Sequence, residues 1–221
     1  MIQVEIERKI IKGEDFEVPC VILKPAEYVG SAVVVHGYGG FKEETLGLAW
    51  RIAEQGFLTG AIDLRGHGEH PMNLDENLLL DLETSISYFK QFGKVTAVGH
   101  SLGGRLSLIS SADYAIGISP AIVKEFSPQT QQLIKENRDY RVRRSDITVF
   151  QILKNMPLYD TKKNSLILYG ERDVPEIISK CQELDSHGEQ TVKIDEALHS
   201  DIFLYEPTFD VITRKLREWY G

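Results

Sequence analysis

The sequence has few cysteines and no long apolar run, and each absence excludes a class of protein. Its two cysteines, Cys20 and Cys181, lie far apart and do not form the spacing of a metal or redox site. Two isolated thiols are typical of a reducing compartment. No stretch is apolar for the roughly 20 residues that a membrane-spanning helix needs. We therefore expect a soluble, cytoplasmic protein without a disulfide framework.

Acidic residues outnumber basic ones. The 221 residues include 25 Lys and Arg and 33 Asp and Glu, which gives a formal net charge of −8. Such a chain is a poor partner for nucleic acid or an anionic membrane, because like charges repel. Residues 1–8 alternate apolar and charged side chains and lack the apolar region of a signal peptide. The expected partner is therefore a small molecule, and either a monomer or a homodimer is compatible with the sequence.

The hydrophobic pattern predicts an α/β fold. With 42% hydrophobic residues, a chain of this length can bury one substantial core, so we interpret residues 1–221 as one domain. Strand patterns occur at 2–10, 16–23, 32–35, 57–64, 94–98, 114–119, 165–170 and 190–195. Helical patterns occur at 42–55, 74–92, 102–112, 175–184 and 207–220. This order predicts an N-terminal antiparallel hairpin followed by a mostly parallel sheet of about eight strands, with helices on both faces.

Reactive side chains follow the ends of several predicted strands. They are His36, Asp63, Ser101, Ser119, Asp173 and His199. In open parallel sheets, ligands bind outside the carboxyl ends of the strands. We therefore expect the functional site at this edge of the sheet.

Ser101 is the predicted nucleophile. It lies in Gly99-His100-Ser101-Leu102-Gly103, between a β-branched strand pattern and a helical pattern, and this segment fits Gly-x-Ser-x-Gly. A serine on a sharp strand-to-helix turn is raised above the end of the sheet, beside the N–H groups of the helix N-terminus. The same letters can form an ordinary turn of small residues. The strand before the turn and the helix after it favour the nucleophile.

A serine nucleophile needs a base and a group that orients the base. His199 follows the last predicted strand and is the predicted base, which gives the chain order Ser, Asp, His. Asp173 is the predicted acid, although an aspartate there could instead cap the following helix. Glu171 is a near alternative and Glu125 a weaker one.

The other five histidines have plainer explanations. His100 lies within the turn and should point away from the cleft, and His36 should form local contacts. His187 lies in an exposed turn. His67 and His70 are separated by a loop that contains a glycine, without the helical spacing of a metal pair. We therefore expect no metal and no cofactor.

A glycine-rich loop, residues 36–40, follows the third predicted strand. Glycine lets the backbone approach a substrate closely. The backbone N–H groups of Tyr38 and Leu102 are the predicted donors to a developing oxyanion. The loop has neither the Gly-Lys-Ser/Thr of a phosphate loop nor Gly-x-Gly-x-x-Gly. An ordinary glycine-rich turn is the alternative interpretation.

Together these motifs resemble the α/β-hydrolase superfamily, and in particular small serine esterases with a His-Gly-x-Gly oxyanion loop. The resemblance covers nearly the whole chain and depends on the order of the segments 36–39, 63–68, 99–104 and 170–173 and of His199. It implies a catalytic triad of Ser101, Asp173 and His199, with the N–H groups of Tyr38 and Leu102 as the oxyanion hole. It also implies a structural role for residues 63–68. The chain is short for this fold, so any cap must be small.

Residues 121–163 interrupt the alternation of strands and helices, and they are the predicted cap. Helical patterns at 127–137 and 146–154 lie within this insertion, whose nine Lys and Arg and five Asp and Glu leave a net charge of +4. This charge could simply complement the acidic body. The sharper hypothesis is that Arg141, Arg143 or Arg144 binds an anionic group of the substrate. Tyr38 and Phe41 are further candidate substrate contacts.

The sequence therefore predicts a serine hydrolase that cleaves small carboxylic esters through an acyl-enzyme. A peptidase, an amidase or a thioesterase could use the same triad. From a different class, the chain could be a non-catalytic protein that binds a small ligand in the same fold.

Overall fold

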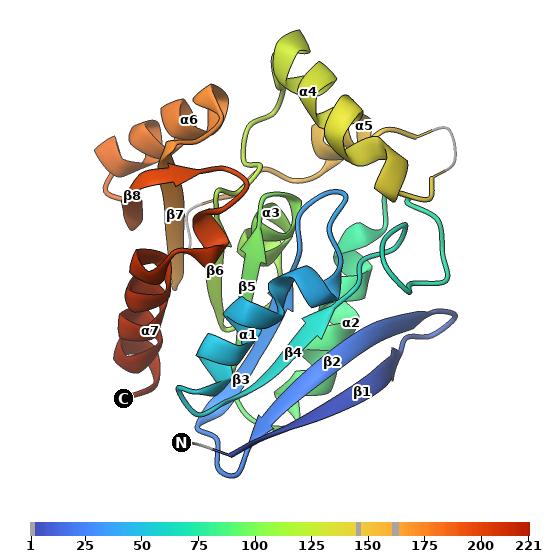
Figure 1. Ribbon diagram of the computed structural model, residues 1–221, viewed down its shortest axis with the longest axis vertical. Helices are drawn as coiled ribbons and strands as arrows, with labels where there is room; N and C mark the ends of the chain where they lie inside the picture. The colour runs from blue at the N-terminus through green and yellow to red at the C-terminus, as the bar shows by residue number, and fades with distance from the viewer. Residues whose placement is uncertain (1–2, 145–146, 161–163) are drawn as a thin grey trace.

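The structure, a computed structural model, describes residues 3–144, 147–160 and 164–221. In these ranges, eight strands form one sheet in the order β1-β2-β4-β3-β5-β6-β7-β8 (Figure 1). The strands are β1 (Val4–Lys12), β2 (Glu17–Pro25), β3 (Gly30–Val35), β4 (Phe57–Ile62), β5 (Val95–His100), β6 (Tyr114–Ile118), β7 (Ser165–Arg172) and β8 (Thr191–Leu198). The helices are α1 (Leu46–Ala53), α2 (Leu78–Lys90), α3 (Leu102–Ile109), α4 (Pro128–Arg138), α5 (Val149–Asn155), α6 (Pro175–Ser186) and α7 (Glu206–Tyr220). Short 3-10 turns are η1 (Lys42–Thr45), η2 (Asp139–Arg141) and η3 (Ile202–Leu204).

The predicted sheet and its N-terminal hairpin are confirmed. β1 pairs antiparallel with β2, and β2 pairs antiparallel with β4, whereas β3 to β8 continue the sheet in parallel. Every residue of β3, β4 and β5 is buried, as expected of parallel strands that are covered on both faces. Because these strands run parallel, their carboxyl ends meet at one edge of the sheet.

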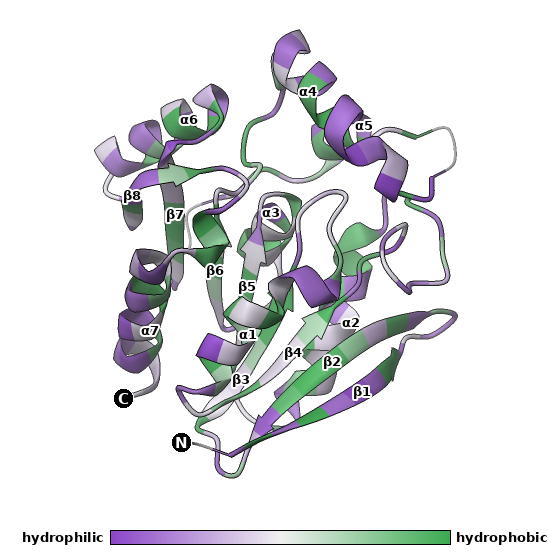
Figure 2. Ribbon diagram, viewed as in Figure 1, coloured by the Kyte–Doolittle hydropathy of each residue, from purple (hydrophilic) through white to green (hydrophobic). Residues whose placement is uncertain are grey.

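The sheet separates two hydrophobic clusters. One contains side chains of α2, α3, α5 and α6, and the other contains side chains of α1 and α7. Figure 2 shows apolar residues along much of β2 and polar residues on much of β1 and α7. The thiols of Cys20 and Cys181 are free and buried. Within the described ranges, no helix combines the length and the apolar character that crossing a bilayer requires.

The cap is the insertion between β6 and β7, in which α4 and α5 are the helices. Both lie beyond one end of the sheet, close to the chain that follows β6 (Figure 1). A proline begins α4, and Thr148 begins α5 with a capping box in which its side chain and that of Gln151 bond each other's backbone N–H. The predicted helix at 146–154 therefore starts later than expected, and residues 145–146 lie outside the described residues.

Two other helix boundaries also differ from the predictions. The helix expected at 74–92 begins only at Leu78, because Leu74 donates its N–H to the Arg143 carbonyl at 2.8 Å and is held against the cap. The helix expected at 42–55 is divided into η1 and α1. The last strand is longer than expected and runs to Leu198, directly before His199.

Candidate active site

Ser101 lies on a strained turn between β5 and α3. Its φ of 54° and ψ of −112° are rare for a residue with a side chain. The turn closes tightly, since a Cβ on Gly99 would lie 2.1 Å from the Gly103 carbonyl oxygen. A Cβ on Gly103 would lie 2.5 Å from the His36 carbonyl oxygen in the glycine-rich loop. The two glycines therefore bring the serine, the helix N-terminus and this loop together.

The structure brings Ser101, His199 and Asp173 into one hydrogen-bonded chain. The Ser101 hydroxyl lies 3.0 Å from Nε2 of His199, and Nδ1 of His199 lies 2.7 Å from Oδ1 of Asp173. With the proton on Nδ1, the imidazole donates to the carboxylate and accepts from the hydroxyl. This is the arrangement that proton transfer from the serine requires.

Asp173 is buried and well supplied with donors. It accepts hydrogen bonds from the Ser119 hydroxyl, from the Val174 N–H at 2.7 Å and from the Gly170 N–H at 3.2 Å. Burial alone would raise the pKa of this carboxyl, but the hydrogen bonds, together with the charge of His199, hold it below its usual range. The side chain therefore stays ionised and fixed in orientation.

The alternative acids lie elsewhere. Glu171 accepts from Lys193 and from the Glu196 N–H on the exposed surface. Glu125 forms an exposed ion pair with Lys154 at 3.1 Å. Neither carboxylate bonds His199, so the arrangement favours Asp173.

The expectation that His100 points away from the cleft is wrong. His100 lines the same pocket as Ser101, and its Nε2 donates to the His199 carbonyl at 2.7 Å. Gly37 makes room for the ring, because a Cβ there would lie 3.0 Å from Nδ1 of His100. Burial, followed by the charge of His199, lowers the pKa of His100 to about 3, so the ring stays neutral. His100 therefore holds the loop that carries the candidate base.

The glycine-rich loop and the first residue of α3 each present a backbone N–H group near Ser101. Within the part of the chain that the structure describes, the N–H groups of Tyr38 and Leu102 donate to no protein acceptor. Nδ1 of His36 donates to the Gly37 carbonyl at 2.7 Å, and Nε2 accepts from the Leu64 N–H at 3.1 Å. Burial lowers the pKa of His36 to about 4, which favours the neutral ring that these bonds need. The local contacts expected of His36 are confirmed, and they fix the loop.

Buried polar contacts fix residues 63–68, which directly follow β4. The buried Asp63 carboxylate accepts from the Lys42 N–H and ammonium group, both at 2.7 Å, and from the Glu69 N–H at 2.8 Å. Arg65 forms an ion pair with Asp81 at 2.7 Å. Among the described residues, no group of three His, Cys, Asp or Glu side chains is placed to hold a metal ion.

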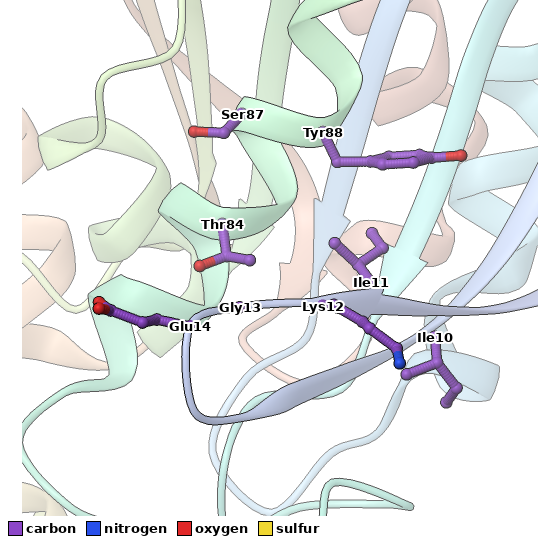
Figure 3. A pocket seen from close by; sticks show the side chains of 8 residues that line it. All are labelled: Ile10, Ile11, Lys12, Gly13, Glu14, Thr84, Ser87 and Tyr88. Atoms are coloured by element: carbon purple, nitrogen blue, oxygen red, sulfur yellow. The ribbon is translucent and has the colours of Figure 1, made fainter.

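Two hollows meet at Ser101. The first, about 390 Å³, is lined by His36, Gly37, Tyr38, Gly40, Glu44, Thr45, His100, Ser101, Ile134, Arg138, Arg141, His199, Ser200, Phe203 and Leu204. The second, about 30 Å³, is lined by Tyr38, Ser101, Leu102, Ala121, Phe126, Ile134, Val149, Phe150, Leu153, Val174, Ile177 and His199. We call the first the open pocket and the second, after the role that we propose for it below, the acyl pocket. A further hollow, about 540 Å³, lies between α2 and the β1–β2 turn (Figure 3), and it shares no lining residue with either.

Of the three cap arginines singled out in the sequence, only Arg141 lines a pocket at Ser101. Arg143 donates to the carbonyls of Gly68 and His70, and Arg144 forms an ion pair with Asp139 at 2.9 Å. Arg143 therefore holds the cap to the loop around Gly68 and His70, whereas Arg144 pairs within the cap.

The pocket linings correct one further assignment of a substrate contact and add one residue. Phe41 lines neither pocket, because the turn from Gly37 to Gly40 is followed by an extended residue that leads the chain away into η1. The sequence did not single out Arg138, which lines the open pocket. The only signal was its place at the end of a helix in the basic insertion.

Comparisons with known proteins agree with this architecture. Pyrococcus furiosus esterase Pf2001 is similar, with a TM-score of 0.72 and 14% identity over 100% of this chain and 94% of that chain. An esterase from Pyrobaculum calidifontis is also similar, with a TM-score of 0.68 and 17% identity over 98% of this chain and 86% of that chain. At such low identity, these similarities show the fold alone.

Sequence comparison gives shorter matches and a family. Ethanol acetyltransferase 1 of Eremothecium cymbalariae is 30% identical over 107 residues, 45% of this chain and 28% of that protein. The same enzyme of Kluyveromyces marxianus is 32% identical over 76 residues, 34% of this chain and 21% of that protein. Each match spans less than a third of the relative's length. A family sequence model, described as the alpha/beta hydrolase family, matches residues 32–168 of this chain. The chain belongs to the alpha/beta hydrolase family.

Proposed function

We propose that the protein is a serine hydrolase that cleaves small carboxylic esters through an acyl-enzyme. The observation that carries the proposal is the hydrogen-bonded chain from Ser101 through His199 to Asp173. A buried carboxylate, an imidazole and a hydroxyl in this order form a nucleophile with its base and its orienting group.

In the first half of the reaction, the Ser101 hydroxyl oxygen bonds to the substrate carbonyl carbon while its proton moves to Nε2 of His199. Asp173 stabilises the imidazolium that forms. The carbonyl oxygen becomes negative and is bound by the free N–H groups of Tyr38 and Leu102. The bond to the alcohol oxygen then breaks, and that oxygen takes the proton from His199. The products of this half are an alcohol and an acyl ester of Ser101.

In the second half, water enters the open pocket. His199 takes a proton from the water while the water oxygen bonds to the acyl carbon. The bond to Ser101 then breaks, and the proton passes from His199 to the serine oxygen. In each half one bond to the acyl carbon forms and one breaks, and no atom changes its oxidation state. The reaction therefore needs no oxidant or reductant.

Acyl transfer to an alcohol is a second candidate, and the similarity to two ethanol acetyltransferases favours it. An alcohol would replace water in the second half and leave as a new ester. The two candidates share the acyl-enzyme and differ only in the acceptor. Turnover of an acetate ester with ethanol present separates them: a transferase gives mostly ethyl acetate, and a hydrolase gives mostly acetate. Amides and thioesters remain alternative substrates for the same residues.

Labelling with a fluorophosphonate, together with ester hydrolysis, tests the proposal. Ser101 should be labelled, and p-nitrophenyl esters should be hydrolysed faster than matched peptide or thioester substrates. Ser101→Ala should abolish labelling and lower kcat by about 10⁶-fold. An unlabelled Ser101 in a folded protein that hydrolyses none of these substrates would indicate a ligand-binding protein instead.

A further inference from the structure

We propose that the site selects esters in which a short acyl group is joined to an alcohol that carries a carboxylate, and that Arg138 binds this carboxylate. This inference rests on the proposed function and adds the substrate class. It depends on the different characters of the two pockets that meet at Ser101.

The acyl pocket is small and apolar. Apart from the residues that it shares with the open pocket, its walls are Leu102, Ala121, Phe126, Val149, Phe150, Leu153, Val174 and Ile177. These side chains offer no polar partner. A volume of about 30 Å³ exceeds only modestly what one water molecule needs, so it accepts an acyl chain of two or three carbons.

The open pocket has the properties that the alcohol side requires. The acyl group stays bonded to Ser101 through half of the reaction, whereas the alcohol must leave and water must enter. A larger pocket permits this exchange, and the open pocket of about 390 Å³ is the larger of the two. Its lining includes most of the polar and charged side chains near Ser101.

The open pocket has an excess of one positive charge, located on Arg138. Glu44 and Arg141 form an ion pair at 2.8 Å and so offset each other. The rings of His36 and His100 are neutral, because burial lowers their pKa values to about 4 and about 3. Within the described ranges, Arg138 forms no ion pair. Its charge is therefore available to a ligand.

The backbone holds Arg138 at this position. Ile134 and Arg138 are one helical turn apart on α4, and both line the open pocket. The Arg138 side chain packs directly against Gly39. A Cβ on that glycine would lie 2.9 Å from Cβ and 3.1 Å from Cδ of the arginine. The glycine, whose φ is +71°, thus lets the end of α4 pack onto the oxyanion loop.

A single guanidinium group favours a carboxylate. Its planar fork matches the two oxygens of a carboxylate, and it keeps its charge at any pH that the protein tolerates. One excess charge neutralises a monoanion but leaves a phosphate monoester, which is close to a dianion at pH 7, only partly neutralised. The favoured ligand is therefore an ester with a carboxylate on its alcohol side.

The test compares acetate esters of similar shape: 4-acetoxybenzoate, 4-acetoxybenzamide and 4-acetoxyphenyl phosphate. Each kcat/KM is divided by the rate of alkaline hydrolysis of the same ester, which removes differences in leaving group. The wild type should prefer the benzoate to the benzamide by about tenfold, the usual size of a charge-assisted contact at a partly exposed site. Arg138→Gln should abolish this preference. Lys135→Gln is the matched control, because it removes an exposed charge of α4 that lines neither pocket.

Equal use of the benzoate and the benzamide by the wild type would overturn the inference, as would a preference that survives Arg138→Gln. Preference for the phosphate would overturn the choice of a carboxylate. In each case turnover itself shows that the hydrolase proposal stands. If none of the three esters is hydrolysed and a fluorophosphonate does not label Ser101, the proposed function itself is overturned.

A second measurement tests the acyl side. The kcat/KM for p-nitrophenyl acetate should exceed that for the hexanoate by at least about tenfold, because the longer chain does not fit the acyl pocket. Phe150→Ala should enlarge this pocket and reduce the ratio, and circular dichroism confirms that the variant is folded. A flat profile in the wild type would overturn the assignment of the acyl pocket.

Discussion

Asp173 shows how single residues of the site depend on distant parts of the chain. Its donors come from the residue after β6, from β7 and the turn that follows it, and from the loop after β8. Ser119 is a positioning residue in this set: it is fully buried, its φ is 45°, and its hydroxyl donates to Asp173. A strained backbone conformation of this kind persists only where the surrounding contacts hold it.

Ser119→Ala should lower kcat about tenfold with little change in KM, because Asp173 would hold the imidazole less firmly. The loss of a hydrogen bond to the charged form should also raise the pKa of Asp173 toward its usual range. Steady-state kinetics across pH measure both effects. Ser107→Ala is the control, since among the described residues this buried hydroxyl bonds only the Gly103 carbonyl, at 2.9 Å within α3. Equal kcat values in both variants and the wild type would contradict the assigned role.

At the scale of elements, α3 has two roles. Its N-terminus carries Leu102, the candidate oxyanion donor, and its close approach to β3 depends on Gly103. One turn further along, Arg105 is fully buried and donates to the carbonyls of Ala121, Val123, Met156 and Pro157. These carbonyls lie at the two ends of the cap. The helix that begins directly after Ser101 therefore also anchors the cap.

Gly103→Ala should destabilise the protein by about 3 kcal/mol, because the new Cβ would meet the carbonyl oxygens of Val35 and His36 at 2.5 Å. Gly47→Ala is a matched control, since a Cβ at that helical position meets nothing within 4 Å. It should be neutral or stabilise by about 1 kcal/mol, through helix propensity. Urea unfolding measures both. Equal stabilities of the two variants would be inconsistent with the packing described here.

Arg105→Met should release the cap. The buried carbonyls that lose their donor should cost about 3 kcal/mol or more in stability, at about 1–3 kcal/mol for each unsatisfied group. Limited proteolysis should cut residues 121–157 faster than in the wild type, and KM should rise more than kcat falls. Arg143→Met provides a comparison, because it removes contacts to Gly68 and His70 at the other side of the cap. An unchanged cutting rate in the Arg105 variant would exclude the anchoring role.

At the scale of the whole molecule, the fold holds three histidines in a neutral form. Burial is the largest cause, and it lowers the pKa to about 4 for His36, about 3 for His67 and about 3 for His100. When the chain unfolds, each ring regains a pKa near 6.5 and binds a proton below that pH. The unfolded state then binds more protons than the native state, so stability falls as the pH decreases from about 6.5 toward 4.

Moving from pH 7 to pH 5 should therefore cost about 2 kcal/mol for each of these histidines. Carboxyls with lowered pKa values, such as Asp173, lose their contribution only at more acidic pH, below the usual aspartate range. Urea unfolding at both pH values measures the difference. His67→Gln should reduce this difference by about a third, because it removes one of the three buried rings. If the His67 variant lost as much stability between pH 7 and pH 5 as the wild type, this explanation would be wrong.

The sequence by itself determined the order of the elements and the residues of the candidate triad. Hydrophobic periodicity is a local property, so strands and helices could be predicted within a few residues. The short motif around Ser101 also has a local meaning, because a strand pattern before it and a helical pattern after it favour a strand-to-helix turn with glycine on both sides. Once the strands are parallel, their ends meet at one edge, which brings Asp173 and His199 within reach of Ser101.

Only the tertiary structure decided which side chains face the pocket. Arg138 lines it and Arg143 does not, because the orientation of α4 depends on how the cap packs onto Gly39 and the loop from Gly66 to Leu74. His100 lies beside His199 because Gly37 leaves space for its ring. Such contacts join residues dozens of positions apart. No local pattern encodes them, since each depends on the shape of both partners after folding.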